Sequence, residues 1–105
     1  MKAEFEPIPL VKNLENKRFE IEVNGHYAFI DYGEKSKQIS LIHTEADPEL
    51  AGTGAASAVV EKALHHVEES GKKLLPFCPY VFAYIKKNPE WKRIVDPGFS
   101  GYDNL

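Results

Sequence analysis

The sequence is poor in cysteine, in long apolar runs and in excess positive charge, and each shortage excludes a class of protein. Cys78 is the one cysteine among 105 residues, which excludes an internal disulfide and every zinc site built from several cysteines. No apolar run approaches the roughly 20 residues that cross a bilayer, so no membrane contact is expected. The 13 basic and 16 acidic side chains give a net charge of −3, which argues against a broad nucleic-acid surface.

Two further absences narrow the class of protein. None of the four histidines has a histidine or carboxylate partner at a convincing metal-ligand spacing, so no metal site is expected. The first residues contain no apolar signal core, which makes the cytoplasm the expected compartment. What is present is an ordinary globular composition, 43% hydrophobic and 28% charged. We therefore expect a single domain over residues 1–105, as a monomer or weak homodimer.

The first half of the chain has the period of antiparallel strands. Apolar and charged residues alternate over 18–23, and Asn24-Gly25 is a strong two-residue hairpin signal. Two more strands are predicted over 26–32 and 39–44, which together form a meander. Residues 1–16, which carry two prolines, are predicted to be an irregular lead-in with an edge strand near their end.

The second half changes to helical spacing. Apolar residues recur on one stripe from Ala56 to Val67, and Ser70-Gly71 ends this helix. The apolar run at 73–78 predicts a buried strand, so that strand, helix and strand form a right-handed parallel crossover. A second helix is predicted over 79–88, followed by a short helical turn and, over 96–105, a tail without a clear period. The fold class predicted by these patterns is mixed α/β.

The stretch Gly52-Thr53-Gly54 lies between a predicted strand and a predicted helix. Backbone N–H groups should converge there near a helix N-terminus with almost no side chain in the way, which suits a phosphate. The alternative, which the residues alone leave open, is a tight turn of small residues packed beneath a helix. A dinucleotide-binding turn fits less well, because Ser57 stands at the position of the third glycine.

Three blocks of sequence carry a family resemblance when taken in order. They are Ile42-His43-Thr44-Glu45, Gly52-Thr53-Gly54-Ala55-Ala56-Ser57, and the specific block that runs from Pro76-Phe77-Cys78-Pro79-Tyr80 to Pro89-Glu90-Trp91. Over residues 17–93 the chain resembles a small subfamily of Gcn5-related N-acetyltransferases (GNAT). The resemblance implies a compact GNAT-like fold, in which an antiparallel meander is followed by a strand-helix-strand crossover and short C-terminal helices.

The resemblance also implies a cofactor, acetyl-coenzyme A (acetyl-CoA). In the wider family, backbone N–H groups of a turn written Arg/Gln-x-x-Gly-x-Gly/Ala hold the pyrophosphate. That turn is matched here by Ala51, Gly52, Thr53, Gly54, Ala55 and Ala56. Ala51 departs from the pattern, so the turn would act through its backbone donors and the helix N-terminus. The implied function is transfer of an acetyl group to an amine that the sequence does not identify.

Four side chains are candidate catalytic residues by the same resemblance. Cys78 would lie near the thioester as nucleophile or as pocket lining, and the alternative is an inert core thiol. Tyr84 would lie near the coenzyme A sulfur and protonate it, and the alternative is simple packing on a helix. Glu45 is a candidate general base or a solvated carboxylate. His43 could share that role, orient Glu45, or be a core residue that alternates with the apolar side chains of its strand.

A second hypothesis keeps the cofactor but not the turnover. The chain lacks the two helices that in the resembled family normally follow the first strand and help to form the acceptor floor. A non-catalytic module that binds coenzyme A or acyl-CoA is therefore the alternative function. A third, purely structural reading predicts neither binding nor a pocket.

Overall fold

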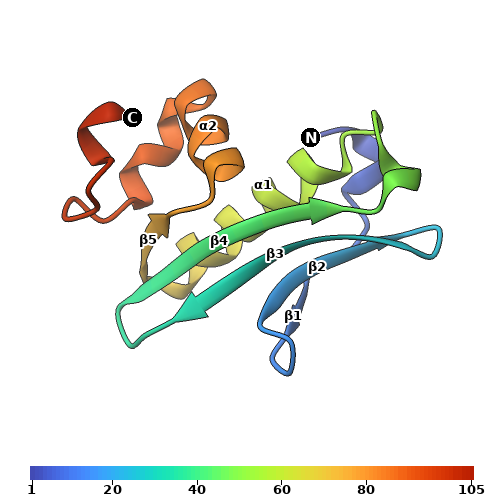
Figure 1. Ribbon diagram of the computed structural model, residues 1–105, viewed down its shortest axis with the longest axis horizontal. Coiled ribbons are helices and arrows are strands. Elements are labelled where there is room, and N and C mark those ends of the chain that lie inside the picture. Colours follow the sequence, from blue (N-terminus) through green and yellow to red (C-terminus); the bar gives the residue numbers. More distant parts are fainter.

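The chain folds into a five-stranded sheet with its helices on one face, as seen in the computed structural model of residues 1–105 (Figure 1). The strand order is β1-β2-β3-β4-β5, and all neighbours are antiparallel except β4 and β5. This arrangement confirms the predicted mixed α/β class and the meander followed by a crossover. The strands are β1 Val11–Asn13, β2 Arg18–Val23, β3 His26–Glu34, β4 Gln38–Ala46 and β5 Lys73–Pro76, and the α-helices are α1 Ala55–Ser70 and α2 Pro79–Lys87.

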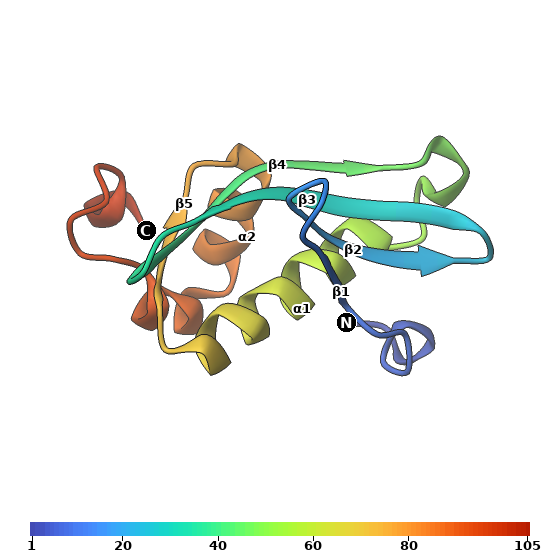
Figure 2. The same ribbon diagram turned by 90° about the horizontal axis from the view of Figure 1, so that it is seen from below.

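Figure 2 shows α1 and α2 on the same side of the sheet, while the opposite face carries no helix. Four short 3-10 helices complete the chain: η1 Ala3–Phe5, η2 Pro48–Leu50, η3 Pro89–Ile94 and η4 Tyr102–Asn104. No charged side chain is buried, so the core between the sheet and the helices is held by apolar contacts. None of the helices is long and apolar enough to cross a membrane.

β4 contains a bulge at Ile42. Opposite the neighbouring residues Asp31 and Tyr32 of β3 stand His43 and Leu41, so Ile42 is an extra residue without a partner. Because side chains alternate along a strand, one extra residue reverses which side chains face the helices. Ile42 itself is 49% exposed.

The bulge decides which side chains of β4 reach the core. Before it, Ile39 and Leu41 are fully buried on the helix side. After it, Thr44 stands opposite the buried Ile30, so Thr44 and not His43 continues the inward row. The alternation in the sequence predicted the reverse, because a bulge depends on pairing with another strand.

β4 and β5 part halfway along β4. Their pairing runs from Gln38↔Lys73 to Leu41↔Pro76. From there to Ala46, β4 is paired with β3 only. The chain after β5 turns away into α2, and the N–H of Cys78 donates to the carbonyl of Leu41 at 2.8 Å. The predicted strand over 73–78 is two residues too long, and Cys78 is the N-cap residue of α2.

α1 is a helix because its small and β-branched apolar residues form one stripe that packs on the sheet. Seven residues of that stripe are buried, and Gly71 ends the helix in the left-handed region at φ 75°, with its N–H bonded to the carbonyl of Glu68. At the other end Gly54 is the N-cap, and no side chain caps the helix. In the first turn of α1, the N–H groups of Ala56 and Ser57 have no partner within the chain.

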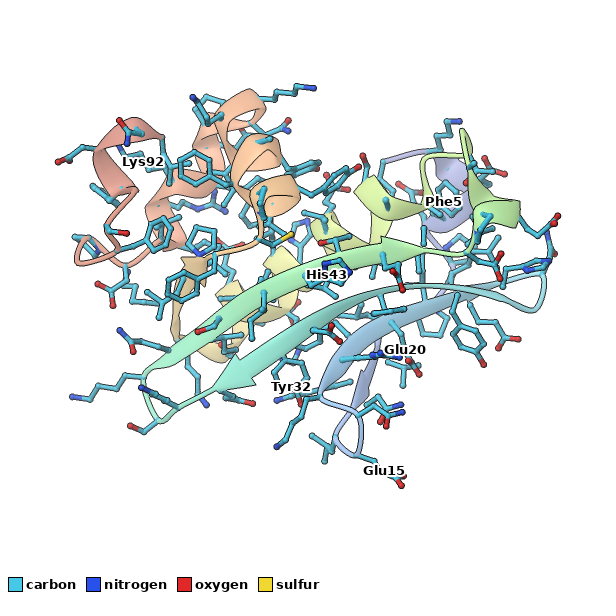
Figure 3. The ribbon with its side chains drawn as sticks, viewed as in Figure 1. Phe5, Glu15, Glu20, Tyr32, His43 and Lys92 are labelled. Carbon is cyan, nitrogen blue, oxygen red and sulfur yellow. The ribbon has the colours of Figure 1, made fainter.

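The lead-in is more ordered than the sequence indicated. Phe5, in η1, is only 1% exposed and belongs to the core, and β1 is an edge strand of the sheet, as expected for the end of this segment. On the surface, the side chain of Lys62 in α1 donates to the carbonyl of Glu6, which connects the N-terminal segment to this helix. In Figures 1 and 3 the N-terminal segment, including Phe5, lies beside the start of α1. The tail is likewise packed, since three of its side chains contact the core: Phe99, Tyr102 and Leu105.

The carboxylate of Glu34 connects β1, the end of β3 and the segment after α1. Glu34, the last residue of β3, accepts from Lys12 of β1 at 2.6 Å and from Lys72 after α1 at 2.5 Å. These two hydrogen bonds, with Lys12 the larger cause, lower the pKa of Glu34 from 4.5 to about 2. The ionised form is therefore favoured in the folded chain.

We expect this pairing to make stability dependent on pH in acid. Glu34 has a lowered pKa, so its contribution is complete above pH 4.5 and is lost as the pH falls toward 2. Because all three side chains are partly exposed, Glu34→Gln should lower the free energy of unfolding at pH 7 by about 1 kcal/mol or less. Urea unfolding of both proteins should show this difference shrinking below pH 4.5.

The matched control is Glu22→Gln, because Glu22 is exposed and forms no ion pair. It should follow the wild type at every pH. A difference between Glu34→Gln and the wild type that stays constant down to pH 2 would contradict this account.

Candidate functional site

The turn before α1 has the backbone geometry of an anion-binding loop. Gly52 has φ 75° and Gly54 has φ 91°, both in the region that favours glycine. A Cβ on Gly52 would meet nothing within 4 Å, so the space above this residue is open. Two glycines are therefore required here by conformation.

Half of the N–H groups in the predicted turn are already bonded within the chain. Ala51 donates to the carbonyl of Pro48 and Thr53 to that of Leu50, and Ala55 donates to the hydroxyl of Thr53 at 3.2 Å. Thr53 thus closes the turn internally. The groups without a partner are the N–H groups of Gly52, Gly54, Ala56 and Ser57. Of these donors, Ser57 was not among the residues predicted from the sequence.

A hollow of about 440 Å³ lies between the first turn of α1 and one side of α2, along the whole length of α2. Ser57 brings the N-terminus of α1 to its wall, and two tyrosines of α2 line the other side. The hydroxyls of Ser57 and Tyr80 are 3.0 Å apart. The lining residues are Ser57, Tyr80, Ala83, Tyr84, Lys87 and Asn88.

Tyr84 is held in this hollow by a contact between the two helices. Its hydroxyl donates to Glu61 of α1 at 3.2 Å. Burial, and then the nearby Glu61 carboxylate and its hydrogen bond, raise the pKa of Tyr84 well above the usual value of 10.0. Tyr84 therefore keeps its proton throughout the physiological range.

Cys78 is not among the residues that line the hollow. It is 2% exposed and is the N-cap residue of α2, at the point where β4 and β5 part. Its Sγ is 3.3 Å from the hydroxyl of Thr44, the inward residue that follows the bulge of β4. The structure thus brings together Cys78 and Thr44, and Thr44 was not among the candidates drawn from the sequence.

His43 and Glu45 lie on the face of the sheet that carries no helix, away from Cys78 and Tyr84. The bulge at Ile42 is the reason, since it turns both side chains outward (Figure 3 labels His43). Their side chains are 59% and 62% exposed, and His43 Nε2 is 3.7 Å from Glu45 Oε1. The expectation that His43 might be a core residue is wrong. The four predicted catalytic residues consequently do not form one cluster.

Glu45 lines a second hollow on that bare face. The hollow measures about 460 Å³ and also borders Tyr27, Phe29 and Asp47. Asp47 is engaged there, because it accepts from the N–H of Glu49 and lies 3.0 Å from His26 Nδ1. The Glu49 N–H, followed by His26, lowers the pKa of Asp47. No group of three histidine, cysteine or acidic side chains is placed to hold a metal ion.

A sequence signal for part of this site did exist. Ser57 and Glu61 are four residues apart on α1, and Tyr80 and Tyr84 are four apart on α2. Residues at that spacing share one face of a helix, so the polar pair of α1 meets the polar pair of α2 between the two helices. Thr44 gave no such signal, because its inward position depends on the bulge.

The residues present fit the coenzyme A that the resemblance implies. The unpartnered N–H groups at the start of α1 suit a pyrophosphate, and the open space above Gly52 allows its close approach. The adjoining hollow would take the less polar part of the molecule against Tyr80 and Tyr84. Ala51 offers no side-chain donor to this ligand.

Comparison with known proteins agrees with these features. The family model described as GCN5-related N-acetyl-transferase matches residues 18–94, from the start of β2 to the end of η3. The match includes the glycine turn, Cys78 and Tyr84. No curated protein matches the chain. The chain therefore belongs to the GCN5-related N-acetyltransferase family.

Proposed function

We propose that this chain binds acetyl-CoA and transfers its acetyl group to the amine of an acceptor. The observation that carries the proposal is the set of unpartnered N–H groups at Gly52, Gly54, Ala56 and Ser57, next to the hollow that Tyr84 lines. When bound, the cofactor supplies an activated acetyl group. The chain supplies the binding site, the orientation and the protons.

The start of α1 is the proposed anchor for the pyrophosphate. Backbone donors and the positive end of the helix dipole act in the same direction, and no acidic side chain stands in the first turn to compete. Because Ala51 contributes no side chain, we expect recognition to depend on backbone geometry. The glycines at 52 and 54 are therefore the sensitive positions.

Tyr84 is the proposed acid. Its raised pKa keeps the hydroxyl protonated, and its place in the hollow makes that proton available to a departing thiolate. Tyr84 must then turn its proton away from Glu61, which accepts it in the free chain. Glu61 is thus the partner that fixes the phenol before the cofactor enters.

Cys78 and Thr44 form a buried contact at the point where β4 and β5 part. The 2% exposure of Cys78 and its contact with the Thr44 hydroxyl support a buried structural role over attack by the thiol. Glu45 and His43 remain candidates for the acceptor side, because they stand on the other face of β4. A base there would act on the amine and not on the cofactor.

The second candidate function is a coenzyme A-binding module without turnover. β1 runs directly into β2 through a turn of four residues, so the chain has no helices there to form an acceptor floor. Such a module would bind coenzyme A, would transfer no acetyl group to a panel of amines, and would be indifferent to Cys78→Ala. Thiol release from acetyl-CoA with that panel separates the two functions.

Gly52→Ala should weaken binding of coenzyme A about tenfold in isothermal titration, the equivalent of one hydrogen bond to a charged group of roughly 1.5 kcal/mol. The added methyl meets no atom of the chain, so the effect should arise from the strained φ of 75° and the blocked approach to the turn. Gly71→Ala is a closely matched control, because Gly71 has the same φ and equally open surroundings at the other end of α1.

Both variants should lose similar stability, about 1–2 kcal/mol, which thermal unfolding measures. Only Gly52→Ala should lose affinity. If the two variants bind coenzyme A equally well, the turn is not the anchor.

Tyr84→Phe should lower kcat about 10²-fold or more, the usual effect of losing a general acid, with little change in KM because the ring remains in the hollow. Tyr80→Phe is the control, since it removes a hydroxyl from the same hollow without removing the proposed acid. Thiol release from acetyl-CoA follows both. Equal kcat values for the two variants would remove Tyr84 from the proposed chemistry.

A further inference from the structure

We propose that Lys2 supplies the cation that the coenzyme A turn lacks at position 51. This inference rests on the proposed function, because it concerns the phosphate groups of the same cofactor. It assigns a binding role to a residue that lies outside the segment matched by the family, residues 18–94.

The N-terminal segment places Lys2 against the turn. A Cβ on Gly54 would lie 3.6 Å from Cε of Lys2 and 3.7 Å from Cε2 of Phe5, so both side chains reach over this glycine. Phe5 is buried in the core, and its N–H donates to the carbonyl of Lys2 at 3.0 Å. Lys2 is therefore held near Gly54 by an anchored turn of 3-10 helix.

The charge of Lys2 is not neutralised within the chain. Lys2 is exposed and forms neither an ion pair nor a side-chain hydrogen bond with any residue. The first turn of α1 contains no acidic residue, and Gly54 provides no capping oxygen. The Lys2 side chain thus lies against the N-cap residue of α1, and its ammonium group has no ion-pair partner.

That arrangement is unfavourable in the free chain, because a cation near a helix N-terminus meets a partial positive charge. A phosphate bound at the turn would interact favourably with both groups, and it would accept from the unpartnered N–H groups and from the ammonium together. The wider family has an Arg or Gln at the position of Ala51. Here the side-chain donor would come from the segment that precedes the sheet.

The test compares three substitutions of Lys2 by isothermal titration with coenzyme A. Lys2→Ala and Lys2→Gln should each weaken binding about three- to tenfold, as expected for a partly exposed contact with a phosphate, while Lys2→Arg should keep the wild-type affinity. Raising the ionic strength to about 1 M should bring the wild type and Lys2→Gln together, since salt screens this contact. Lys35→Ala, an exposed lysine in the turn between β3 and β4, should have no effect.

Each remaining outcome has a definite meaning. If wild type binds coenzyme A and Lys2→Gln binds it equally well, the role of Lys2 is overturned and the proposed function stands. Tighter binding by Lys2→Ala also overturns it, because the segment would then obstruct the turn. If the wild type binds no coenzyme A, the proposed function and the role of Lys2 both fail. Circular dichroism of each variant confirms that the fold is retained.

Discussion

β4 has to satisfy two neighbours, and the candidate site depends on how it does so. On one side it pairs with β3 along nearly its whole length, with a bulge at Ile42. On the other side it pairs with β5 only as far as Leu41 and then continues alone. The bulge and the end of the β5 pairing are adjacent in sequence. Together they turn Thr44 inward and place Cys78 at the point where the strands separate. α2 follows directly from that point.

The start of α1 has an N-cap residue without a capping side chain. Relative to glycine, a Ser, Thr, Asp or Asn at the N-cap would stabilise the helix by roughly a few tenths of a kcal/mol. Here Gly54 is the N-cap, and Thr53 spends its hydroxyl on closing the turn. The N–H groups that a cap would have bonded remain available to a ligand. The apolar stripe of α1 on the sheet compensates for this loss, since burial of each large apolar side chain contributes about 1.5–3 kcal/mol.

Local periodicity was sufficient to predict most of the fold. The alternation in β2 and β3, the Asn24-Gly25 turn and the stripe of α1 are all properties of neighbouring residues. The bulge could not be read in this way, because it depends on how β4 pairs with β3, and so a core position for His43 stayed open as an alternative. Phe5 escaped prediction because a lone aromatic beside prolines has no period. The contact of Tyr84 with Glu61 joins residues on two different helices.

The most direct test of this account is a crystal structure of the chain with coenzyme A. The account predicts pyrophosphate oxygens within hydrogen-bond distance of the N–H groups of Gly52, Gly54, Ala56 and Ser57. It also predicts the sulfur beside Tyr84, in the hollow between the start of α1 and α2. Coenzyme A bound on the bare face of the sheet, near Glu45, would contradict it.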